Sequence, residues 1–80
     1  MYRKLRKEKT KLFTVDCNNL EAEMKRKRIS RMDIANLLNV SYSTIHSRFN
    51  GNSEWLYNEC VIIRDAYFQG MELDYLFKTE

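Results

Sequence analysis

Hydrophobic residues recur three and four positions apart through most of this chain, which is the spacing of amphipathic α-helices. The clearest run is residues 30–51, SRMDIANLLNVSYSTIHSRFNG. Within it, Ile34 and Leu38 share one helical face, and Ile45 and Phe49 share another after a short interruption. The pattern therefore predicts two short helices joined by a tight turn, which is a helix-turn-helix.

Residues that favour the start of a helix precede both predicted helices. Ser30 is a natural N-cap, and Asp33 three residues later completes an Asp variant of the capping box. Ser41 is the second N-cap, and Gly51 stands where a helix ends in a left-handed residue. Together with the small Ala35 at the expected helix crossing, these signals favour a helix-turn-helix over a generic helical hairpin.

A first helix is predicted ahead of this unit, from Cys17 to Lys27, with Asp16 as its N-cap. Leu20 and Met24 form its inward face, and Glu23 lies on its flank. The short β-prone run before it, residues 12–15, is expected to pack as an extended lead-in.

A fourth helix is predicted to start at the N-cap Ser53 and to end at Gly70. A short fifth helix, with Leu73, Leu76 and Phe77 inward, closes the core. The stripe of the fourth helix consists of residues at four, three and four spacing, Leu56, Cys60, Ile63 and Tyr67.

These last two helices carry more apolar residues than one face can bury in a small domain. The additional residues are Trp55, Val61, Ile62, Ala66 and Phe68. The surplus indicates a partner surface, most simply a homodimer through helices four and five, and the alternative is a thick core that absorbs it.

The amino-acid composition narrows the choice of fold class. With 80 residues, no proline and only two glycines, the chain has room for one domain and few obligatory breaks, which favours an all-α fold. No apolar run approaches the ~18–20 residues that cross a bilayer, and no apolar segment follows the charged N-terminus as in a secretory signal. We therefore expect a cytoplasmic protein.

Charge is distributed unevenly. Residues 1–31 carry +7 and residues 32–80 carry −4, within a net charge of +3. Residues 1–13 are interpreted as a flexible basic arm and residues 14–80 as the helix-turn-helix domain; the alternative for the arm is a solubilising tail. The run Lys25–Arg28 is either a solvated helix end, favoured by the helix dipole, or a phosphate-facing patch beside the second helix.

No catalytic or metal-binding motif is present in the sequence. Cys17 and Cys60 are too far apart for a CxxC motif and are interpreted as reduced, packed thiols. His46 is the only histidine and has no ligand at metal-binding spacing, so we interpret it as a structural or solvent residue. The sequence predicts no enzyme and no cofactor.

If the second helix of the central unit, residues 42–50, enters a major groove, the side opposite Ile45 must face the bases. A serine hydroxyl can donate or accept a hydrogen bond and so discriminates poorly between bases. We therefore expect weak direct readout of the base sequence and an affinity that depends on phosphate contacts and salt. At about 100° per residue that side carries Ser43, Ser47 and Asn50, with Thr44 at its edge and Tyr42 at its leading end.

Residues 30–51 resemble the Cro/C1-type helix-turn-helix of phage and bacterial repressors, S-x-x-x-[LI]-A-x-x-L-x-V-S-x-x-T-I-x-x-x-x-x-G. The continuation RFNGNSEW, followed by Glu59 and Ile63, is similar to a subgroup of small phage-borne regulators with a [KR]-[LF]-N-G-x-x-E-[FW] signature. The resemblance runs from Asp16 to about Phe77. The residues that match the main pattern are Ser30, Ile34, Ala35, Leu38, Val40, Ser41, Thr44, Ile45 and Gly51.

The resemblance implies a five-helix, all-α Cro/C1 repressor-like domain that binds operator DNA, usually as a homodimer through its C-terminal helices. It implies base contacts from Tyr42, Ser43 and Ser47. The phosphate contacts that we expect, partly from the resemblance and partly from the residues themselves, are Arg31, Ser41, Thr44, Arg48, Asn50, Asn52 and Ser53. The basic arm is an addition to the family pattern.

The sequence therefore predicts a transcriptional regulator that binds a double-stranded DNA operator and acts by occupying it. The alternative is an antirepressor or modulator, which uses the same fold to bind another phage regulatory protein. Single-strand or RNA binding is a weaker alternative, because the aromatic residues fall mainly in the acidic half of the chain.

Overall fold

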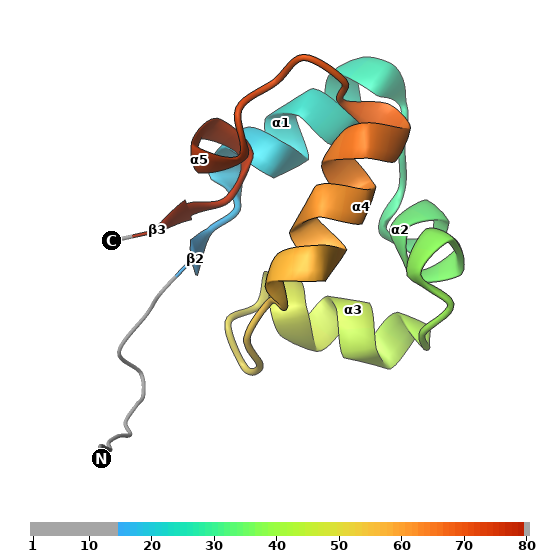
Figure 1. The fold of residues 1–80 in the computed structure, drawn as a ribbon. Helices are drawn as coiled ribbons and strands as arrows, with labels where there is room; N and C mark the ends of the chain where they lie inside the picture. Colours follow the sequence, from blue (N-terminus) through green and yellow to red (C-terminus); the bar gives the residue numbers. More distant parts are fainter. Residues whose placement is uncertain (1–14, 80) are drawn as a thin grey trace.

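Helices dominate the computed structural model, which describes residues 15–79 (Figure 1). The structure confirms the all-α class, with one short pair of strands added. In chain order the elements are β2 (Val15–Asp16), α1 (Asn18–Lys27), α2 (Arg31–Leu38), α3 (Tyr42–Phe49), α4 (Tyr57–Tyr67), α5 (Leu73–Leu76) and β3 (Lys78–Thr79).

The two strands join the beginning and the end of the described chain. They pair antiparallel, with Val15 opposite Thr79 and Asp16 opposite Lys78. The predicted extended lead-in falls partly here, and its residues 12–14 lie outside the described residues, as does the predicted basic arm. Local pattern does not show which distant strand an extended segment meets, so the pairing was not predicted.

Helix α1 begins one residue later than predicted. Cys17 occupies the N-cap position, while Oδ1 of Asp16 accepts a hydrogen bond from the backbone N–H of Asn18 at 2.9 Å. Leu20 is buried as predicted. Glu23 is buried as well, because its carboxylate accepts a hydrogen bond from the Tyr75 hydroxyl at 2.8 Å.

Helices α2 and α3 begin at the predicted caps. Oγ of Ser30 accepts a hydrogen bond from the Asp33 backbone N–H at 3.1 Å, and the Asp33 carboxylate accepts one from the Ser30 N–H at 2.9 Å, which completes the capping box. Oγ of Ser41 accepts a hydrogen bond from the backbone N–H of Thr44 at 3.1 Å. Between the helices, Asn39 adopts a left-handed conformation, and this single residue allows the tight turn.

The predicted start and end of the fourth helix were wrong. Helix α4 begins at Tyr57, because the Ser53 hydroxyl accepts a hydrogen bond from Arg48 and the Glu59 carboxylate caps the N–H of Leu56 instead. Leu56 was predicted in the core stripe and is exposed. The helix ends at Tyr67, and residue 70 lies in the turn that follows.

Every helix contributes to one core. Phe68, which follows α4, is fully buried, so the core absorbs part of the apolar surplus predicted for this region. The predicted short fifth helix is confirmed as α5. Trp55 packs edge-on against Phe49 and Phe77, with ring centroids 5.2 Å apart in both pairs. The fully buried side chains are Leu20, Ile34, Ile45, Ile63, Phe68 and Leu76.

Both cysteines are free thiols within this core, as predicted. Burial raises the pKa of Cys60 to about 12, with a smaller contribution from the nearby Glu59 charge. Burial also raises the pKa of Cys17, although the neighbouring Trp55 indole lowers it somewhat. Within residues 15–79, no helix is both long and apolar enough to cross a membrane.

Candidate nucleic-acid interface

Helix α3 runs along the bottom edge of the molecule in Figure 1, and its outer face is polar. Its inward residue Ile45 is fully buried, while Tyr42, Ser43 and Asn50 are exposed and Ser47 is half-buried. The structure thus brings the predicted base-contacting residues together on one accessible side of α3.

Hydroxyl groups gather at the N-terminus of this helix. Oγ of Ser41 lies 2.9 Å from Oγ1 of Thr44 and 3.2 Å from Oγ of Ser43. The Ser41 and Thr44 hydroxyls are therefore occupied by the cap. The first-turn backbone N–H groups of Tyr42 and Ser43 have no partner inside the helix, so these amides remain available to an anion.

Arg31 connects three helices beside this face. Its Nη2 donates a hydrogen bond to the Glu21 carboxylate on α1 at 2.7 Å, and its Nη1 lies 3.0 Å from Nδ1 of His46 on α3. The guanidinium stacks 4.6 Å from the centre of the Phe49 ring. Arg31 lies next to α3 as expected, but Glu21 neutralises part of its charge.

The contact with Arg31 indicates which ring nitrogen of His46 accepts. Arginine is only a donor, so this contact assigns Nδ1 of His46 as the acceptor and leaves Nε2 as the N–H donor. Nε2 is 2.9 Å from Nδ2 of Asn50, a contact that becomes a hydrogen bond when the amide turns its oxygen toward the ring. The Tyr42 ring stacks on His46 at 5.9 Å. His46 is thus the centre of a polar cluster on the α3 face.

Arg48 does not face outward, which corrects its predicted role as a phosphate contact. Its Nε and Nη2 donate hydrogen bonds to the two Glu59 carboxylate oxygens at 2.8 and 3.0 Å, and Nη1 donates one to the Ser53 hydroxyl at 3.1 Å. The Arg48 and Glu59 side chains are only 15% and 10% exposed. The Ser53 hydroxyl accepts one of these hydrogen bonds and keeps its O–H as a donor, so its predicted phosphate contact stays a prediction.

The turn after α3 brings the chain back toward the helix. Gly51 has φ +82°, a conformation that favours glycine. The backbone N–H of Asn52 donates a hydrogen bond to the Ser47 carbonyl at 2.9 Å, and the residue itself is exposed. Asn52 therefore remains available at the end of the α3 face, as expected.

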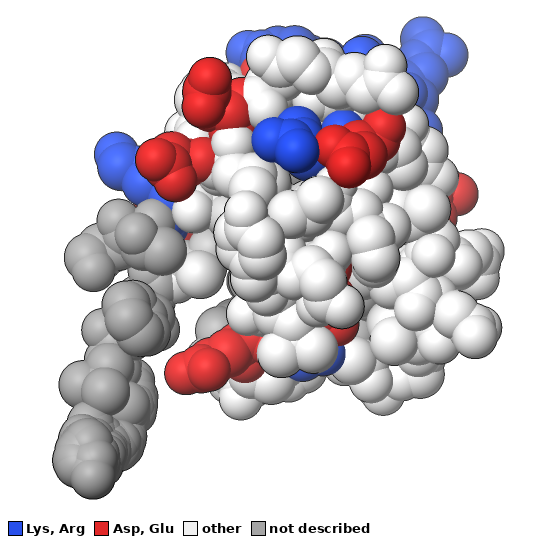
Figure 2. All heavy atoms as spheres, in the orientation of Figure 1, with Lys and Arg blue, Asp and Glu red and all other residues white. Residues whose placement is uncertain are grey.

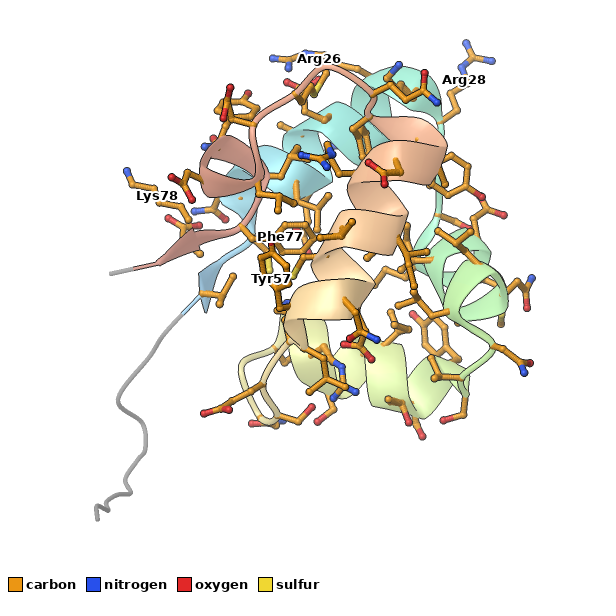
Figure 3. All side chains as sticks on the ribbon, in the orientation of Figure 1. Arg26, Arg28, Tyr57, Phe77 and Lys78 are labelled. Atoms are coloured by element: carbon orange, nitrogen blue, oxygen red, sulfur yellow. The ribbon has the colours of Figure 1, made fainter. Side chains whose placement is uncertain are left out.

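The basic run Lys25–Arg28 does not border α3. Arg26 and Arg28 lie at the upper edge of Figure 3, whereas α3 runs along the lower edge in the same orientation. Figure 2 shows Lys and Arg mainly along the upper edge of this view and a largely uncharged surface below. The run is exposed, as expected of a solvated helix end, and its alternative role as a phosphate-facing patch beside the second helix stays a prediction.

The cluster around His46 was not predicted from the sequence. Its partners Arg31 and Glu21 come from two other helices, and only the spacing of four residues between Tyr42, His46 and Asn50 was visible in the sequence. Comparisons with protein-family models, with curated proteins and with solved structures gave no match.

Proposed function

We propose that this chain binds double-stranded DNA with α3 in the major groove and acts as a transcriptional regulator of the Cro/C1 type. The observation that carries the proposal is the accessible polar face of α3, with Ser43, Ser47 and Asn50 on the side opposite the buried Ile45. The resemblance of residues 30–51 to the Cro/C1-type pattern supports the same assignment.

In this proposal, Tyr42, Ser43 and Ser47 approach base edges, and Asn50 adds an amide suited to adenine. Phosphates are met by the first-turn amides of α3, by Asn52 and by Arg31. Two Arg31 contacts are made within residues 15–79, to Glu21 and His46, so the remaining guanidinium N–H groups are free to bind a phosphate.

The near-neutral α3 face limits how much affinity this surface supplies. Most of the positive charge of the chain lies elsewhere, with six Lys or Arg and one Glu in residues 1–11. We therefore expect modest affinity that falls steeply with salt, because sequence-independent attraction to phosphate depends on such charges.

A pair of matched charge insertions tests the proposal. Ser43 and Asn58 occupy the same second helical position, of α3 and α4 respectively, and both are exposed. A Glu is favoured by the helix dipole at that position, so Ser43→Glu and Asn58→Glu should both fold. Only the first places a negative charge on the proposed DNA surface.

The measurement is fluorescence anisotropy with a labelled duplex at several salt concentrations. We expect Ser43→Glu to weaken binding by about tenfold, as one close like-charge contact costs on the order of 1 kcal/mol or more, and Asn58→Glu to bind like wild type. Equal weakening by both variants, or none by either, would contradict the role of α3.

A second candidate is a protein-interaction module that binds a second copy of this chain or another regulatory protein. It is favoured by four large hydrophobic side chains that remain exposed on or beside α4 and α5, which are Leu56, Tyr57, Ile62 and Tyr75. Wild-type protein that stays monomeric in sedimentation experiments would contradict the homodimer and leave a different protein as the partner.

A further inference from the structure

A surface cavity of about 450 Å³ lies on the side of the molecule where β2, the turn before α4 and α5 meet. Its walls include Val15, Trp55, Tyr57 and Phe77, with the Cys60 side chain also lining it. Figure 3 shows Tyr57 and Phe77 next to each other between α4 and β3. The Tyr57 side chain is 76% exposed, although it borders this largely apolar space. The cavity is therefore shaped and lined to receive an apolar side chain.

Two carboxylates also line the cavity. Glu54 comes from the turn before α4 and Asp74 from α5. Neither carboxylate takes part in a hydrogen bond or ion pair with another residue in the part of the chain that the structure describes. Arg48 also lines the cavity, but its guanidinium is paired with Glu59. Among the described residues that line the cavity, the two charges without a partner are therefore both negative, which complements a basic ligand.

The chain itself carries a matching segment at this place. Residues 9–13 read Lys-Thr-Lys-Leu-Phe and directly precede Val15, which is a wall of the cavity. Alternate residues of an extended strand share a side, so Phe13 falls on the same side as Val15 if the backbone direction of β2 continues. Two residues of chain span at most about 7 Å, so the length of the chain lets Phe13 reach the cavity from Val15.

We propose that this cavity binds residues 9–13 of the same chain, with Phe13 in the apolar space and Lys9 and Lys11 beside Glu54 and Asp74. The attachment point supplies a high local concentration of the ligand, so a short segment with one aromatic anchor is sufficient. The docking proposal does not rest on the proposed role of the outer α3 face in DNA binding, although Lys9 and Lys11 belong to the basic segment expected to strengthen that binding.

Trp55 reports on the cavity directly, because it is the only tryptophan of the chain and one of the walls. The experiment compares full-length wild type with Phe13→Ala, using Trp55 emission and acrylamide quenching. Tyr2→Ala is the matched control, since it removes an aromatic ring from the same basic segment but outside the docking residues. Melting curves from far-UV circular dichroism establish that each variant is folded at the measuring temperature.

Burial of a phenylalanine side chain is worth roughly 10- to 100-fold in a binding equilibrium, so Phe13→Ala should shift the docking equilibrium strongly toward the free segment. We expect Trp55 emission to move to longer wavelength and quenching to increase in Phe13→Ala but not in Tyr2→Ala. Trp55 emission and quenching that are the same in Phe13→Ala and wild type would overturn the proposal.

A charge variant and an NMR measurement complete the test. Glu54→Gln with Asp74→Asn should move Trp55 emission in the same direction by a smaller amount, and wild type should approach that value at high salt. Nuclear Overhauser contacts between the Phe13 ring and Trp55 should arise within one molecule. Contacts that appear only between differently labelled molecules would assign the cavity to a second copy and contradict the intramolecular docking.

Discussion

The buried ion pair between Arg48 and Glu59 connects α3 to the start of α4. The substitution Arg48→Met removes this pair. The substitution keeps most of the apolar stem and removes three hydrogen bonds, two to Glu59 and one to Ser53. The Glu59 side chain, which is 10% exposed in the wild-type structure, then keeps the N–H of Leu56 as its remaining hydrogen-bond donor among residues 15–79.

A buried charge that loses its partner costs about 3–5 kcal/mol. We expect the low end, about 3 kcal/mol, because the 15% exposure of Arg48 lets some water reach the site. A domain of this size has a total free energy of unfolding of roughly 3–10 kcal/mol, so the variant should be close to unfolding. Adding Glu59→Gln to Arg48→Met should restore about 2 kcal/mol of the free energy of unfolding, because the amide is neutral and its oxygen still accepts the hydrogen bond from the Leu56 N–H.

Urea denaturation followed by far-UV circular dichroism measures these free energies. Arg64→Met is the control, because Arg64 pairs with the adjacent Asp65, whose side chain is 61% exposed. It should change the free energy of unfolding by no more than about 0.5 kcal/mol. A stabilising role of the buried pair is contradicted if Arg48→Met lowers the free energy of unfolding no more than Arg64→Met, or if Glu59→Gln adds to the loss instead of reducing it.

Two further outcomes follow from the caps and the thiols. Ser30→Ala should lower the free energy of unfolding by about 1 kcal/mol through loss of the capping box, and calorimetry that finds no change in melting temperature would contradict this. Cys60 should resist iodoacetamide at pH 8.5 in the folded protein and react on unfolding, because burial raises its pKa to about 12 and keeps the thiol protonated. Rapid labelling of the native thiol would show that Cys60 is accessible. Between about pH 9 and 12 the folded state holds a proton that the unfolded state releases, so the free energy of unfolding should fall as the pH rises through this range.

Elements with strong local signals were predictable from the sequence. The caps Ser30 and Ser41 satisfy backbone groups within three residues, so the starts of α2 and α3 depend on little else. The burial of Ile34 and Ile45 followed from helical spacing in the same way. The polar face of α3 was then fixed as the side opposite Ile45.

Features that depend on distant partners were not predictable. Ser53 is a good N-cap by residue type, but the Arg48 guanidinium occupies its hydroxyl and α4 begins at Tyr57. Glu59 was assigned no role and proves to pair with Arg48 and cap Leu56. Such contacts depend on how helices cross, which residue spacing within a single helix does not determine.

Contact between the outer face of α3 and duplex DNA can be observed residue by residue in an amide-resolved NMR titration with a short duplex. We expect the largest shift changes at Tyr42–Asn50, together with Arg31, and small changes along α4 and α5. Changes concentrated on α4 and α5, or an unchanged spectrum at saturating duplex, would contradict binding through α3.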